Sequence, residues 1–85
     1  MEEYMASHGT TITRIEEYTD GYESYIWHVF YLDGTHETFW KMCDTLPSRV
    51  LLAMQEASSI SENHIVERDV YGNIEEEYTI KTYSI

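Results

Sequence analysis

Carboxylates are the side chains of this sequence best placed to do chemistry: 16 Asp and Glu stand against five Lys and Arg, a formal net charge of −11 in 85 residues. They are interleaved with two Trp, two Phe and eight Tyr. Because a disordered acidic tail would lack these aromatics, we expect the charge to lie on a folded surface. A folded anion of this kind attracts cationic partners and repels phosphate.

The acids gather in two stretches of the sequence. In the later stretch, Glu75 and Glu77 are predicted to share one face of a strand about 7 Å apart, with Glu76 on the other face, since a strand rises roughly 3.4 Å per residue. This pattern predicts a regular anionic ladder. The candidate partner-binding acids are Glu67, Asp69, Glu75, Glu76 and Glu77 in this stretch and Glu16, Glu17, Asp20 and Glu23 around an earlier turn.

The charge density suggests a mimic of nucleic acid. A compact chain of this length is roughly 30 Å across, and duplex DNA presents about 18 phosphates over that distance. The hypothesis is an inhibitor that enters the basic groove of a nucleic-acid-binding protein, as a phage or mobile-element product aimed at a host nuclease or defence system would. The competing interpretation is that the acids serve only solubility and discourage aggregation.

Direct nucleic-acid binding and catalysis are not predicted. The five basic residues are scattered without a stripe, and no Ser-His-Asp or Glu-x-x-His element is present. We expect His28, on an apolar strand face, to be a packed, hydrogen-bonded ring. His36 and Cys43 match no zinc-ligand spacing, and the short Asp-Gly turns lack the ligands of a calcium loop. The sequence thus predicts no enzyme, no cofactor and no metal.

Alternating and periodic segments predict an α+β domain spanning residues 1–85. Its expected order is β-β-β-α-β-β, an antiparallel sheet with one helix packed on one face. The first strand is expected at an edge and the second, rich in aromatic residues on both faces, at the centre. The predicted segments are strands at 10–18, 22–32, 64–70 and 74–84, a third strand after Asp33-Gly34, and a helix at about 46–59 with Thr45 as its N-cap.

Turn residues predict the strand registers. Asp33-Gly34 is typical of a two-residue hairpin turn, which would pair Leu32 with Thr35 and Trp27 with Trp40. The last hairpin has two alternatives: a two-residue Gly72-Asn73 turn, or a wider turn with Asp69 first and Gly72 fourth, which shifts the register.

One helix covers one sheet face, so a second apolar face remains for a partner. The residues expected on it as an apolar interface are Ile26, Phe30, Leu32 and Phe39. Either the segment around Tyr4 and Met5 folds over this face or a second subunit does, and the alternative function is therefore a small interaction or homodimerisation domain.

Three features of the sequence favour a cytoplasmic protein without a membrane segment. These are the single cysteine, the acidic start Met1-Glu2-Glu3 and the lack of a span of about 20 apolar residues.

Overall fold

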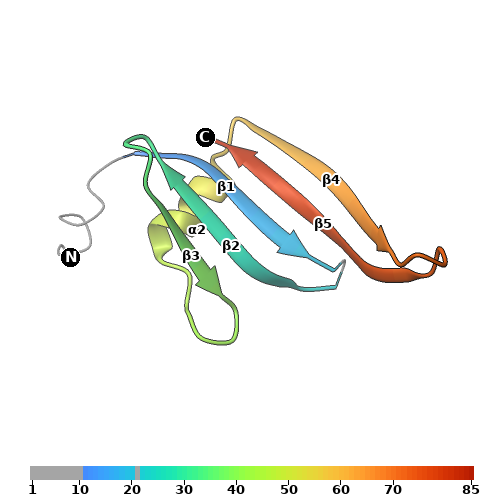
Figure 1. The fold of residues 1–85 in the computed structure, drawn as a ribbon. Helices are drawn as coiled ribbons and strands as arrows, with labels where there is room; N and C mark the ends of the chain where they lie inside the picture. The colour runs from blue at the N-terminus through green and yellow to red at the C-terminus, as the bar shows by residue number, and fades with distance from the viewer. Residues whose placement is uncertain (1–10, 21) are drawn as a thin grey trace.

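The computed structural model describes residues 11–20 and 22–85 as one antiparallel five-stranded sheet with a helix against one face (Figure 1). The α+β class and the antiparallel sheet predicted from the sequence are confirmed. The strands lie in the order β3-β2-β1-β5-β4. The elements along the chain are β1 (Ile12–Thr19), β2 (Ser24–Tyr31), β3 (His36–Trp40), α2 (Ser48–Gln55), β4 (Ser59–Arg68) and β5 (Ile74–Ser84).

The middle strand of the sheet is β1, so its predicted edge position is wrong. It pairs with β2 on one side and with β5 on the other, from Arg14 opposite Ser84 to Thr19 opposite Thr79. The mixed polarity that suggested an edge has another cause: Ile15 is fully buried, and the polar Glu17 is partly buried and hydrogen-bonded to Tyr83. β2, expected at the centre, lies between β3 and β1 and is internal.

The register predicted for the hairpin of β2 and β3 is wrong by one residue. The Tyr31 N–H donates to the Thr35 carbonyl over 2.9 Å, which leaves a three-residue loop closed by Gly34 at φ 91°. The Asp33 carboxylate favours this wider loop, because it accepts from both the backbone N–H and the hydroxyl of Thr35.

This slip changes which residues share a face. Trp27 is opposite Phe39, and Ile26 is opposite Trp40. Of the predicted apolar interface, Phe39 therefore packs against the core on the helix side, and Leu32 lies in the loop, 71% exposed. Only Ile26 and Phe30 remain on the face away from the helix.

The last hairpin adopts the wider of its two predicted turns. Gly72, at φ 88°, donates its N–H to the Asp69 carbonyl, and the Asp69 N–H donates to Asn73. The Asp69 carboxylate also accepts the backbone N–H groups of Asn73 and Tyr71, and these hydrogen bonds lower its pKa. β5 has its predicted bounds, while β4 begins at Ser59, five residues before the predicted His64.

Replacing either loop glycine by alanine should lower the free energy of unfolding by about 1 kcal/mol, the cost of a left-handed backbone for a residue with a Cβ. An added Cβ at Gly34 or Gly72 would meet no atom within 4 Å, so the loss is conformational rather than steric. Chemical denaturation measures it. Asparagine, which tolerates this conformation, should recover part of the loss, and an unchanged midpoint for Gly72→Ala would contradict the assigned turn.

The helix α2 is shorter than predicted, and Thr45 does not cap it. Pro47 occupies the N-cap position, and no side chain makes a cap hydrogen bond. The helix ends at Gln55, and the chain then turns into β4; just before that strand, the Ser58 N–H donates to the Ser84 carbonyl over 2.8 Å.

The core lies between α2 and the sheet. Val50 of the helix is fully buried against Ile15 and Val29. Leu46, Ala53 and other partly buried side chains pack around this centre. The buried hydrophobic residues among those the structure describes are Ile12, Ile15, Val29, Tyr31, Val50 and Tyr83.

The β4–β5 hairpin extends beyond the helix, and the molecule measures 51 × 28 × 23 Å along its principal axes (Figure 1). Almost every residue of β4 is exposed. The segment around Tyr4 and Met5, expected to cover the second face, falls outside the described residues. Within the described ranges, no helix is long and apolar enough to cross a membrane.

Candidate functional site

The acids around the first turn are engaged by the protein's own groups. The clearest case is Glu17, whose carboxylate accepts the Tyr83 hydroxyl at 2.6 Å, the Ser24 hydroxyl at 2.7 Å and the Trp27 Nε1–H at 3.0 Å. Partial burial raises the pKa of Glu17, but these hydrogen bonds and the charge of Lys81 outweigh it, so the net pKa is lowered. This acid stays ionised and holds three strands together.

The other three acids of that group also have hydrogen-bond or ion-pair partners within the protein. Asp20 accepts the Tyr25 hydroxyl and the backbone N–H groups of Tyr22 and Glu23, which lower its pKa to about 2. Glu16 pairs with Arg14, and Glu23 pairs with Lys41. The first predicted acidic group is therefore mainly structural, although Asp20 still lies at the surface.

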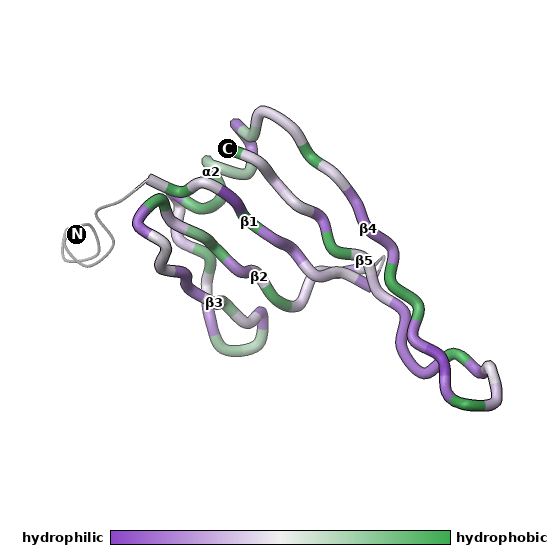
Figure 2. Tube along the Cα trace, turned by 45° about the horizontal axis from the view of Figure 1, so that its top comes forward, coloured by the Kyte–Doolittle hydropathy of each residue, from purple (hydrophilic) through white to green (hydrophobic). Residues whose placement is uncertain are grey.

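The acids of the last hairpin differ, because three of them have no ion pair in the described part of the chain. We call Glu67, Glu75 and Glu76 the distal carboxylates. Glu67 lies directly opposite Glu76 across β4 and β5, and the register irregularity there leaves Glu75 without a cross-strand partner. The regular anionic ladder predicted from the sequence is therefore interrupted at Glu75. Figure 2 shows hydrophilic residues on both strands of this hairpin before its turn.

The remaining two acids of this group are partnered. Glu77 lies 2.8 Å from His64 Nε2, and Asp69 holds the turn as described above. The nearby Arg68 guanidinium donates to the Gly72 carbonyl rather than to a distal carboxylate.

A row of rings crosses the sheet face opposite the helix, which we call the open face. Tyr18 stacks with Tyr78 at 6.0 Å between centroids and meets His28 edge-on at 5.3 Å. His28 contacts Phe30, and Phe30 stacks with His36 at 5.9 Å. As predicted, His28 is packed and hydrogen-bonded, its Nδ1 lying 3.0 Å from the Thr38 hydroxyl. The row depends on the observed register, so the sequence alone did not reveal it.

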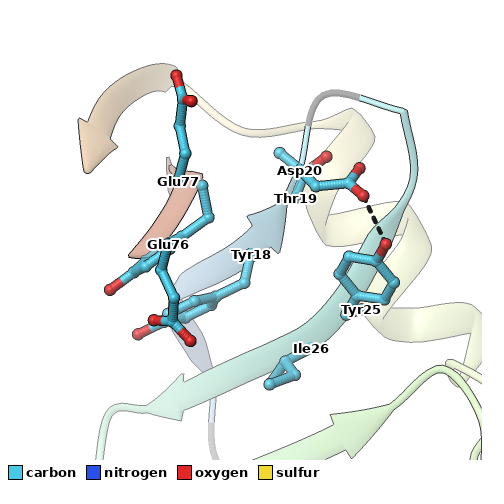
Figure 3. Close-up of a pocket in the computed structure, with 8 residues that line it drawn as sticks. Tyr18, Thr19, Asp20, Tyr25, Ile26, Glu76 and Glu77 are labelled. Atoms are coloured by element: carbon cyan, nitrogen blue, oxygen red, sulfur yellow. Dashed lines mark hydrogen bonds between the residues drawn. The ribbon is translucent and has the colours of Figure 1, made fainter. Parts of the chain in front are cut away.

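A cavity of about 430 Å³ lies where β1 ends and β5 continues past it toward the hairpin turn (Figure 3). Tyr18, Tyr78 and Ile26 form its apolar part, and carboxylates from both acidic stretches stand at its rim. Asp20 comes from the first group, and Glu76 from the second. The residues that line it are Tyr18, Thr19, Asp20, Tyr25, Ile26, Glu76, Glu77 and Tyr78.

Sequence reasoning missed this cavity, because it joins positions far apart in the chain. Only the pairing of β1 with β5 brings Asp20 near Glu76, and no local signal in the sequence indicates that pairing. The structure thus places one acid of the first group, Asp20, and two of the second, Glu76 and Glu77, around the same cavity.

The exposed thiol of Cys43 lies in the loop after β3, outside this site. No group of three or more His, Cys, Asp or Glu side chains placed to hold a metal ion is found in residues 11–20 and 22–85. No protein-family model, curated protein or solved structure matches this chain. The site's own geometry is therefore the basis for a function.

Proposed function

We propose that this chain is a non-enzymatic inhibitor that inserts its distal hairpin into the basic nucleic-acid-binding groove of a partner protein. The observation that supports this is the group of distal carboxylates, which have no ion pair with any residue that the structure describes and lie on a hairpin that the helix leaves uncovered. Carboxylates form strong hydrogen bonds with Arg and Lys, as phosphates do.

The arrangement of these acids favours binding over solubility. Like charges directly opposite on neighbouring strands destabilise a sheet, and Glu67 and Glu76 are such a pair. Solubility is served equally well by dispersed acids, which carry no such cost. Tyr78 lies close enough to this pair to feel both charges, and it stacks with Tyr18, so the partner would meet partly buried aromatic rings near negative charges, as it does on single-stranded nucleic acid.

The setting we propose is the cytoplasm of a bacterial host, where a phage or mobile element gains from blocking a nuclease or another defence protein. Such proteins carry basic grooves, and a small acidic chain can occupy one without chemistry of its own. The proposal involves no cofactor and no direct contact with nucleic acid.

Capture with the immobilised native chain tests this proposal. The retained protein should be a nucleic-acid-binding protein, and its affinity should fall steeply between about 50 and 200 mM salt, since several ionic contacts are lost together. Retention that is indifferent to salt, or retention of proteins that bind no nucleic acid, would count against it.

A second candidate function is homodimerisation through the open face, because the ring row with Ile26 and Phe30 has no covering element among the described residues. Light scattering tests it. This candidate requires a dimer at micromolar concentration that persists in high salt and becomes a folded monomer in Phe30→Ser. A native chain that is monomeric at every salt concentration would eliminate it.

A further inference from the structure

The cavity at the end of β1, beside β2 and β5, has the chemistry to bind one particular side chain of the partner. We propose that it binds the guanidinium group of an arginine, with the planar group lying on the tyrosine rings and its N–H donors directed to the rim carboxylates. This inference rests on the proposed function and names the contact at its centre.

The walls of the cavity suit a flat organic cation. Tyr18 and Tyr78 are stacked with an interplanar angle of 22°. Ile26 completes the apolar lining beside Tyr18 (Figure 3). Guanidinium groups stack on tyrosine faces and are more weakly hydrated than ammonium groups, so they enter such a site at lower desolvation cost. The volume lies within the range of cavities that bind small organic groups.

The rim supplies one carboxylate, Glu76, that the described part of the fold does not use. Tyr25 and backbone groups bind Asp20, and His64 binds Glu77, but Glu76 has no ion pair or side-chain hydrogen bond to residues 11–20 or 22–85. Together with Glu67 opposite, Glu76 forms a carboxylate pair whose mutual repulsion a bound cation would relieve. The pKa of Tyr78 is raised by partial burial and then by the charges of Glu67 and Glu76, which indicates a negative potential at the ring.

Arginine fits this arrangement better than lysine. Its fork of five N–H donors can bond two carboxylates at once while the plane stays stacked, whereas an ammonium is a point charge without a stacking face. Opposed residues of a cross-strand pair have Cβ atoms about 4.5–5.5 Å apart, a separation that one guanidinium can bridge.

The test uses three capped tripeptides, Gly-X-Gly, in which X is arginine, lysine or citrulline, the neutral analogue of arginine. Binding is followed by NMR on the ring signals of the tyrosines. The arginine peptide should shift the Tyr18 and Tyr78 signals and bind at least about tenfold more tightly than the citrulline peptide. Equal binding of the arginine and citrulline peptides would overturn the assignment. So would binding of the arginine peptide that leaves the NMR signals of both the Tyr18 and the Tyr78 ring unchanged.

Variants separate the cavity from net charge. Glu76→Gln should weaken arginine-peptide binding about fivefold, whereas Glu56→Gln, the same charge change at the far end of α2, should change it less than about twofold. Tyr78→Leu, checked for folding by circular dichroism, should remove the preference for arginine over lysine. Equal effects of Glu76→Gln and Glu56→Gln would overturn the inference in favour of diffuse attraction.

The two proposals fail in different ways. If the native chain displaces nucleic acid from a captured partner while the arginine peptide does not bind the cavity, the inference is wrong and the proposed function stands. If the peptide binds the cavity but no partner loses its nucleic acid, the proposed function is wrong.

Discussion

Replacing Glu17 by alanine should lower the free energy of unfolding by about 3 kcal/mol, because hydrogen bonds to charged groups contribute roughly 1.5–3 kcal/mol each and lost partners are left partly buried. The substitution removes the acceptor of the Tyr83 hydroxyl, the Trp27 Nε1–H and the Ser24 hydroxyl. Tyr83 is only 8% exposed, so water cannot fully replace the carboxylate there. Urea denaturation measures the loss.

The neighbouring Glu16 is the matched control. It lies on the same strand but on the open face, paired with Arg14 at the surface, and Glu16→Ala should cost less than about 1 kcal/mol. An equal loss for the two variants would mean that Glu17 is an ordinary surface acid.

The lowered pKa of Glu17 also fixes a pH dependence. Because the folded pKa is below the ordinary value of 4.5, the unfolded state binds more protons as the pH falls through that value. The contribution of Glu17 to stability is therefore complete above pH 4.5 and is lost as the pH falls through the folded pKa. The alanine variant should lose less stability than the native chain over this acid range.

Reversing the charge of one distal carboxylate should have the largest effect on binding. Glu76→Lys removes a contact with the basic groove and adds a repulsion, so we expect the affinity for the captured partner to fall about 50-fold, in line with the loss of a desolvated charge contact. The same change places Lys opposite Glu67 and should raise stability by about 0.5 kcal/mol. Titration calorimetry and thermal melting measure the two quantities.

Glu56→Lys is its control, since it changes the net charge by the same amount at the C-terminal end of α2. It should also stabilise slightly, because a cation is favourable at that end of a helix. Its effect on affinity should stay below about threefold, the level of long-range attraction. A comparable loss in both variants would show that only total charge matters to the partner.

Local residue patterns predicted where most of the strands lie along the chain, but they did not predict which strands are neighbours in the sheet. The turn at Tyr71-Gly72-Asn73 predicted β5 from Ile74 to about Ser84, as observed, whereas the central place of β1 depends on pairing with a strand more than 50 residues later. The length of a hairpin loop is also not determined by its turn residues alone. Asp33-Gly34 is compatible with both a two-residue and a three-residue loop, and the choice depends on hydrogen bonds from Thr35 to the Asp33 side chain.

The sequence predicted which kinds of residue form the candidate site, but not where in the fold they meet. The sequence marked Glu17 and Glu76 alike as surface acids, but the fold turns the first toward three hydrogen-bond donors and leaves the second without an ion pair among the described residues. Burial and partner geometry distinguish them, and both depend on strand register. For the same reason Phe39 and Leu32 were placed on the wrong surface, while Ile26 and Phe30 were placed correctly.

Competition with nucleic acid tests the central claim most directly. The native chain is added to the captured partner bound to a labelled nucleic acid, and the released label is followed by fluorescence anisotropy. We predict full release by the native chain, with Glu76→Lys requiring about 50-fold more protein, as its weaker binding implies. A stable ternary complex of partner, nucleic acid and native chain would contradict the claim.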